Sequence, residues 1–475
     1  MSTGIGYYLD FALDANSQEV GSTGWWRGVL ERVIDERRLD DDLISRYMRG
    51  DHPTAFATQR YREAFGAMLA PLRDDWLSVV VEAATERLIV DGLRGPARDE
   101  TGDNSAWEIW QENGLDARMP MGFDEAVKYG CCHLVVSPGD TPDDAPVILV
   151  VPASRAVVRR DPSRPLERQA GMHAWVDEDG RHIVVWTRTS FTEWFMDPTT
   201  RRWEKVDDRE NVIGVVPIIP MANRPTLRFP DGQSDVRDIL PLQDAINKLL
   251  ADLMVASEWV AFPQRWATGL EIPTDPATGQ QIDGFVAALN RLWTVESEDT
   301  KFGEFSAANL QNYTDPIELI VRHIAAHTRT PPHYLMGNMA NASAEALKAA
   351  EAGLVSRVRA KQQTFGEGIE EAIRLAFAFA GDTERATYRG WETIWRDPET
   401  RTEAERVDAL TKLASIGVPQ EALWMRIPGV TPQEIERWRV MRDQEALAMG
   451  LSVGQLPVST TEPPQPPPPV DQQGG

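Results

Sequence analysis

Two helical patterns that flank a short insert constrain this chain more than any other feature. The first runs from Ser234 to Phe262, where apolar or small side chains recur every three or four residues and form one stripe on a helix. The stripe consists of Ile239, Leu242, Ile246, Leu249, Leu250, Leu253 and Ser257. Asp235 is the expected N-cap and Pro263 the expected stop, while Pro241 predicts either a kink or a late start.

The second helical pattern covers residues 315–328. Asp315 is the expected N-cap, because proline follows at the first helical position and Glu318 stands three residues after the cap. Pro331 and Pro332 end the pattern. The segment between the two patterns carries several turn signals and more acidic than basic residues. Two helices that rise to a small insert and return form a stalk, and the rest of the chain is expected to be the body that holds it.

Composition narrows the classes of function. A chain of 475 residues predicts about three domains, and an apolar fraction of 42% is ordinary for a globular protein. The formal charge of -24 argues against holding nucleic acid by phosphate neutralisation, which needs lysine and arginine. Cys131 and Cys132 lie in a strand-like run and are expected to be buried reduced thiols, since a metal site would need more ligands nearby. We find no secretory signal at Met1 and no apolar run long enough to cross a bilayer, so no membrane partner is expected.

The body changes character along the chain. Residues 1–95 are predicted to be helical, including a helix from Trp76 to Val90 that ends at Gly92, and the helical part continues to Tyr129. Residues 130–219 then form short β-branched or aromatic runs typical of strands. Asp179-Gly180 predicts a tight turn between two of these strands. The run from Val212 to Ile219 is interrupted at Pro217 and is expected to be an edge strand or the exit from the sheet.

The chain after the stalk returns to helix. A long helix is predicted from Ala344 to Ala380, and two capping boxes open shorter helices that end near Ile416 and Met449. The tail past Leu456 is rich in proline and is expected to be disordered. The fold class predicted from these patterns is α+β, mainly helical.

No catalytic constellation stands out, so an enzyme is the minority hypothesis. Phosphate-cradling loops, zinc-protease signatures and nucleophile elbows do not occur where they would matter, and no cofactor is expected. His323 and His327 share a helix face, but we expect a packed or interfacial pair rather than zinc ligands. The tryptophan-rich stretches around Trp25 and Trp107 favour core or subunit interface over stacking on bases. The acidic run 296–299 favours a solvated face, with a basic protein partner as the alternative.

The order of several short motifs resembles the portal proteins of tailed double-stranded DNA bacteriophages, in particular those of long-tailed phages of actinobacteria. The resemblance spans residues 47–450. The motifs that carry it are Tyr47 with Gly50–Pro53, Glu86–Leu88 with Gly92, Asn223–Pro225, Leu240–Lys248, Pro263–Arg265 with Gly269, Pro331–Pro332 with Tyr334–Gly337, and Asn341–Lys348. None of these motifs is catalytic, and their specificity comes from their order and spacing together.

The resemblance implies a fold of four parts known as wing, stem, clip and crown. It assigns the wing to residues 1–233, the stem helices to 234–262 and 313–332, and the clip to 263–312. It assigns the tunnel loop and a long wing helix to 333–398, the crown to 399–450 and a disordered tail to 451–475. The stalk inferred from periodicity and capping agrees with the stem and clip of this map.

The resemblance also implies a role. The protein would form a ring, usually of about twelve subunits, at one capsid vertex of the virion, and would assemble in the host cytoplasm. Double-stranded DNA would pass through its channel during packaging and ejection. Its partners would be the terminase large subunit, a head–tail connector, and the major capsid and scaffold proteins. A packaging or processing enzyme, or another capsid or scaffold protein, remains the alternative.

Two sets of residues are expected to serve this role. The tunnel and channel would be lined by Asn338, Met339, Asn341, Ser343, Lys348, Asp244 and Asp252. The docking surface of the clip would include Arg291, Glu296, Glu298 and Asp299. Because the first stalk helix and the insert are both acidic, we expect the channel wall to repel DNA rather than bind it.

Overall fold

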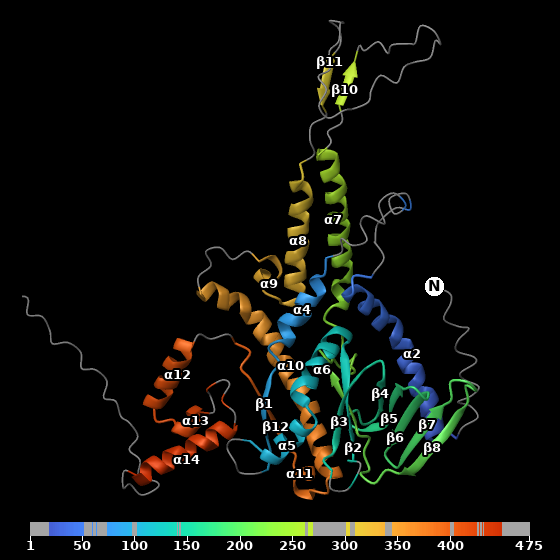
Figure 1. The fold of residues 1–475 in the computed structure, drawn as a ribbon, viewed down its shortest axis with the longest axis vertical. Coiled ribbons are helices and arrows are strands. Elements are labelled where there is room, and N and C mark those ends of the chain that lie inside the picture. Colours follow the sequence, from blue (N-terminus) through green and yellow to red (C-terminus); the bar gives the residue numbers. More distant parts are fainter. Residues whose placement is uncertain are drawn as a thin grey trace, which may run out of the picture.

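The computed structural model describes residues 19–51, 59, 63, 74–96, 102–139, 141, 144–261, 265–268, 301–304, 309–337, 344–399, 403–424, 427, 430 and 432–448. Figure 1 shows a body of helices and sheets from which a thin pair of helices projects, with a separate group of helices beside the body. Helix exceeds strand in the described chain, so the predicted α+β class is confirmed. None of the described helices is both long and apolar enough to span a membrane.

The larger sheet is a five-stranded antiparallel meander in the order β4-β5-β6-β7-β8. Its strands are β4 (Ala156–Arg160), β5 (Arg168–Val176), β6 (Arg181–Thr187), β7 (Ser190–Met196) and β8 (Trp203–Glu210). The predicted turn at Asp179-Gly180 joins β5 and β6, because the Asp177 carboxylate accepts hydrogen bonds from the backbone N–H groups of both turn residues. Strand β4 was not predicted from the sequence.

The smaller sheet has three antiparallel strands in the order β3-β2-β9. They are β2 (Cys131–Ser137), β3 (Val147–Pro152) and β9 (Ile218–Ala222). Strand β9 lies at the edge, as predicted, but it begins only after Pro217, so the strand expected from Val212 is wrong at its start. Proline has no N–H for the ladder, and the preceding residues instead form turns around Asn211, whose side-chain amide donates to the Val215 carbonyl.

Four helices precede or cover these sheets. They are α2 (Thr23–Met48), α4 (Trp76–Thr85), α5 (Asn104–Glu112) and α6 (Leu115–Tyr129). The side chains of Ser22, Asp75 and Asp103 cap the first three of them. Helix α2 packs its Leu30 and Ile34 onto the five-stranded sheet, which buries one face of the meander.

The helix expected from Trp76 to Val90 is wrong in its last part. Helix α4 ends at Thr85, and Val90–Arg94 forms strand β1, which pairs antiparallel with β12 (Glu392–Trp395). Ion pairs at 2.7 Å between Arg94 and Glu392 and at 2.8 Å between Arg396 and Asp91 flank the ladder. A partner from the far end of the chain therefore overrides the local helical pattern.

The stalk consists of two antiparallel helices and, beyond them, two paired antiparallel strands (Figure 1). Its elements are the short 3-10 helix η1 (Arg237–Ile239), α7 (Leu240–Ala261), β10 (Arg265–Thr268), β11 (Lys301–Glu304) and α8 (Gln311–Thr328). Ser234 caps the first turn, because its hydroxyl accepts from the N–H groups of Val236 and Arg237. The predicted Asp235 cap is therefore wrong, as this carboxylate is buried among cationic side chains. Helix α8 begins four residues before the predicted Asp315 start and contains Pro316.

The chain returns from the stalk through α9 (Pro332–Met336) into the long helix α10 (Ala344–Phe379), as predicted, and then α11 (Thr383–Thr387). Helix α10 runs through the body and buries Leu354, Val358, Phe365 and Ile369. The rings of Phe365 and Phe123 on α6 stack with centroids 5.4 Å apart. One continuous core joins the body to the base of the stalk.

The last described helices form the group beside the body. They are α12 (Glu403–Ser415), α13 (Gln420–Trp424) and α14 (Pro432–Ala448). The bounds of α12 and α14 are close to the predicted ones, whereas α13 was not predicted. Glu421 pairs with Arg442 at 2.6 Å, and the Trp424 and Trp438 rings meet edge to face, which joins α13 to α14. The tail, predicted to be disordered, lies outside the described residues.

Candidate functional site: the stalk and its base

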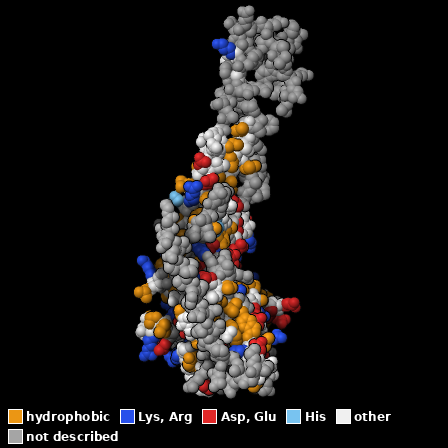
Figure 2. All heavy atoms as spheres, turned by 90° about the vertical axis from the view of Figure 1, so that its left-hand side faces the viewer, with side chains coloured by type: hydrophobic (Ala, Val, Ile, Leu, Met, Phe, Trp, Pro, Cys, Tyr) orange, Lys and Arg blue, Asp and Glu red, His pale blue; other side chains and the backbone are white. Residues whose placement is uncertain are grey.

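The apolar surface of the two stalk helices is covered only in part by the subunit itself. Ile246 on α7 and Ile324 on α8 are fully buried near the body. Farther along, the Met254 side chain is 39% exposed and that of Leu319 is 53% exposed. Figure 2 shows hydrophobic side chains exposed along the stalk beside acidic ones. A single subunit therefore leaves apolar stalk surface in contact with water.

The first turns of α7 are clamped to the body by side-chain amides. Gln243 donates to the Asp74 carbonyl at 2.6 Å and accepts from the Trp76 N–H at 3.1 Å. The side-chain amide oxygen of Asn247 accepts a hydrogen bond of 3.1 Å from the backbone N–H of Asp74. Both amides are buried, so each bond is shielded from competing water.

Asp244 belongs to the same clamp. Its carboxylate accepts a hydrogen bond of 2.8 Å from the Tyr47 hydroxyl at the end of α2. Burial raises the pKa of Asp244 against the opposing effect of this bond. This predicted channel residue therefore also makes a contact within its own subunit.

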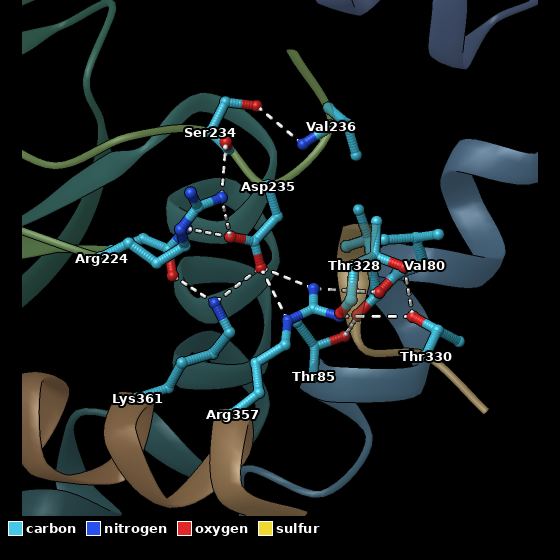
Figure 3. A network of polar contacts seen from close by, with 12 residues as sticks. Val80, Thr85, Arg224, Ser234, Asp235, Val236, Thr328, Thr330, Arg357 and Lys361 are labelled. Carbon is cyan, nitrogen blue, oxygen red and sulfur yellow. Dashed lines mark hydrogen bonds and ion pairs between the residues drawn. The ribbon is translucent and has the colours of Figure 1, made fainter. Parts of the chain in front are cut away.

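A buried ionic cluster lies below the clamp, where η1 leaves the body (Figure 3). The Asp235 carboxylate is 5% exposed and accepts from Arg357 Nη2 at 2.5 Å and Nε at 3.1 Å, and from Lys361 Nζ at 2.7 Å. Its other oxygen accepts from the Asn223 amide at 3.0 Å and from Arg224 at 3.4 Å. Burial alone would raise the pKa of Asp235, but Lys361 and Arg357 outweigh it and hold the pKa well below its usual range.

This stalk-base cluster, formed by Asn223, Arg224, Asp235, Arg357 and Lys361, joins five parts of the chain. Arg357 also donates to the carbonyl of Thr328 in the last turn of α8 at 2.8 Å and to that of Val80 in α4 at 3.3 Å. One guanidinium on α10 thereby connects the start of the first stalk helix, the end of the second, and the body.

The structure locates only some of the residues proposed to line the channel. Asp252 pairs with Lys248 one turn earlier on α7, and Lys348 is exposed near the start of α10. The tunnel residues Asn338, Met339, Asn341 and Ser343 lie outside the described residues. The same holds for the docking residues Arg291, Glu296, Glu298 and Asp299.

The stalk-base cluster was missed from the sequence, although α10 carries a signal for it. Leu354, Val358 and Phe365 define the buried face of α10, and the positions of Arg357 and Lys361 fall on that same face. Two cations within an apolar stripe indicate a buried partner of opposite charge. Asp235, which the sequence assigned to a cap, is that partner.

The adjacent cysteines and Trp110 follow the simpler expectations. Cys131 and Cys132 are buried free thiols, as predicted, and burial raises the pKa of Cys131 to about 12. His323 and His327 are exposed on α8, so they are not packed within the subunit, and an interfacial pair stays a prediction. The described residues contain no histidine, cysteine or carboxylate group arranged to hold a metal ion. Trp110 is buried and donates to Asp116 at 2.7 Å, as expected of a core tryptophan.

Comparison with known proteins identifies the class. Residues 73–447 match the sequence profile of the family described as phage portal protein, SPP1 Gp6-like. The chain therefore belongs to the phage portal protein family, and it is a structural protein of the bacteriophage virion.

Two named relatives agree. The portal protein of Mycobacterium phage L5 is 31% identical over 488 residues, covering 94% of this chain and 98% of the relative. The portal protein of Mycobacterium phage D29 is 31% identical over 467 residues, covering 89% of this chain and 92% of the relative. The resemblance found in the short motifs is thus confirmed, and neither relative favours a packaging enzyme or a scaffold protein.

Proposed function

We propose that this portal protein assembles into a closed ring of about twelve subunits at one capsid vertex. The observation that carries the ring is the half-covered apolar surface of the stalk, including Met254 on α7 and Leu319 on α8. Neighbouring stalks arranged around an axis would bury it, and a head-to-tail contact that closes gives a cyclic assembly. The axial channel then serves DNA packaging and ejection.

Ring formation is tested on the purified full-length chain by native mass spectrometry and negative-stain imaging. Wild type should give closed rings at micromolar concentration. Leu319→Lys combined with Met254→Lys should raise the concentration needed for assembly at least about tenfold, because each change removes burial of an apolar side chain. Glu318→Lys places the same charge at an exposed polar position of α8 and should assemble nearly as wild type. Only monomers or dimers of the wild type would refute the proposal.

The parts of the subunit are proposed to have separate roles. Residues 1–233 with the long helix α10 form the wing, α7 and α8 form the stem, and residues 399–450 form the crown. The insert 263–312 forms the clip, whose Arg291, Glu296, Glu298 and Asp299 dock the terminase large subunit and the head–tail connector. The pairing of β10 with β11 supports an insert with a fold of its own. Because α8 begins at Gln311, the insert ends before that residue rather than at residue 312.

We propose that the stem presents DNA with a wall that repels it. Tight binding would stall translocation, since every neutralised phosphate must be released again at the next step. Asp244 and Asp252 on α7 supply part of this wall, and the tunnel residues Asn338, Met339, Asn341 and Ser343 add an uncharged constriction. Lys348 on α10 makes weak, transient phosphate contacts.

The isolated ring should bind duplex DNA poorly at physiological salt. Replacing Asp244 and Asp252 with lysine should raise the affinity at least about tenfold and impair packaging, whereas Lys348→Ala should have a milder effect. Tyr47→Phe is the control, because it removes the Asp244 hydrogen bond without adding charge. Fluorescence anisotropy across a salt series measures the affinity. Sub-micromolar binding with a steep salt slope in the wild type would overturn the repelling wall.

A further inference from the structure

A cavity of about 440 Å³ opens onto the stalk-base cluster. Its floor is formed by Asp235, Arg357 and Lys361, and its rim includes Arg224, His327 and Arg329. The floor side chains are buried, whereas Arg224 and Arg329 are exposed at the mouth. We call this cavity the stalk-base pocket.

Positive charge dominates the lining of the stalk-base pocket. Three arginines and one lysine line it, against the single carboxylate of Asp235. The surplus lies in a chain whose formal charge is -24, so it runs against the composition of the whole protein. A concentration of cations around one shared carboxylate leaves charge to be compensated by a group from outside the subunit.

The surplus of positive charge is unfavourable for Lys361 at the floor of the stalk-base pocket. The Lys361 side chain is 2% exposed, and its ammonium donates to Asp235 and to the Asn223 side chain. An ammonium has three N–H groups, so one more acceptor is needed to satisfy it. Burial, opposed by Asp235 but reinforced by Arg357, lowers the pKa of Lys361 to about 8.

The rim arginines have an unusual backbone. Arg224 has φ 49° and Arg329 has φ 53°, both in the left-handed region that favours glycine or asparagine. In the described part of the chain only one other non-glycine residue, Arg201, has a positive φ. Within the described chain, no carboxylate pairs with Arg329, and the one carboxylate that pairs with Arg224 is the shared Asp235. Strained residues that present charge to a pocket are typical of a binding site.

We propose that the stalk-base pocket binds a phosphate-like oxyanion, held by the guanidinium groups of Arg224 and Arg329 and by the ammonium of Lys361. Guanidinium groups match the geometry of phosphate oxygens, and a buried ammonium adds a point charge. The bound anion would connect the chain after β9, the chain after α8 and the long helix α10. Occupancy would therefore stiffen the attachment of the stalk to the body.

The test measures binding of inorganic phosphate to the full-length protein by calorimetry, with sulfate as a second probe and chloride at equal ionic strength as reference. Phosphate should bind saturably and raise the unfolding temperature. Arg224→Asn and Arg329→Asn should each weaken binding at least about tenfold, since each removes a charge-assisted hydrogen bond.

The design separates binding from folding. Asparagine tolerates a positive φ, so Arg329→Asn should be as stable as wild type without phosphate. Arg224→Asn additionally loses the 3.4 Å contact with Asp235, but the Arg224 side chain is 47% exposed, so the change in stability should be small. Arg201→Asn makes the same exchange at the third left-handed arginine, away from the pocket, and should bind phosphate as wild type does. The proposal is overturned if wild type shows no phosphate-specific binding, or if all three variants weaken it equally. It is also overturned if a carboxylate of a neighbouring subunit fills the pocket and phosphate does not bind to the ring.

Discussion

Replacing Asp235 with asparagine should destabilise the stalk base by about 3–5 kcal/mol, the usual cost of removing one partner from a buried ion pair. The carboxylate is the shared counter-charge of Arg357 and Lys361, both of which are buried with it. Asparagine preserves shape and some hydrogen bonding but leaves both cations uncompensated. The stalk and α10 would then lose their common attachment.

Hydrogen–deuterium exchange provides the local measurement, because a chain of this size need not unfold in one step. Amides around residues 236–246 and 354–361 should exchange at least about a hundredfold faster in Asp235→Asn. Asp238→Asn, three residues later and exposed, removes the same charge and should exchange as wild type does. Equal exchange in Asp235→Asn and wild type would show that the cluster does not hold the stalk.

The pH dependence of stability has a definite sign. The pKa of Asp235 is lower in the folded protein than in the unfolded chain, so its contribution is fully present above the ordinary carboxyl pKa of about 4. That contribution is lost as the pH falls further, when the unfolded chain takes up the proton first. Asp235→Asn should therefore lose less stability than wild type between neutral pH and pH about 3.

Removing the insert should abolish packaging while leaving ring formation intact. Replacing residues 263–309 with a short glycine–serine linker keeps α7 and α8 whole, since these helices end at Ala261 and begin at Gln311. Under the proposed function, docking of the terminase large subunit and of the connector is lost with the insert. Pull-down of each partner and a packaging assay measure the loss.

A matched variant tests whether the effect belongs to the insert. Deleting residues 451–475, the proline-rich tail, removes a segment outside the described core and should leave ring formation and docking unchanged. Circular dichroism and imaging verify that the rest of the subunit still folds in both variants. A ring without the insert that still docks its partners and packages DNA would show that the clip lies elsewhere.

Local signals explain which elements were predictable. The bounds of α10 followed from a helical period, and α7 and α8 were found by periodicity and by the prolines that bound them. The hairpin β5–β6 followed from strand composition and an Asp-Gly turn. These features depend on residues within a few positions of one another, so one sequence is enough to reveal them.

The predictions that were wrong concern residues whose structure depends on partners far away in the sequence. Val90 lies in a strand because Trp395 and its neighbours pair with it, and nothing near Val90 indicates that partner. Asp235 has the sequence context of a cap, but Arg357 and Lys361, more than a hundred residues later, determine its role. The family emerged from motif order, whereas the stalk-base cluster required the fold.

The β1–β12 ladder also constrains the order of events during synthesis. Strand β1 can pair only after its partner β12, which ends at Trp395, has been synthesised. The body therefore cannot finish folding until most of the chain has left the ribosome. Both stalk helices emerge earlier, with their apolar stripe exposed. A polypeptide released prematurely would lack β12 and hence a complete body. Under the proposed function, only chains that include β12 would enter a ring, so a subunit that ends before Trp395 would not be incorporated into a particle.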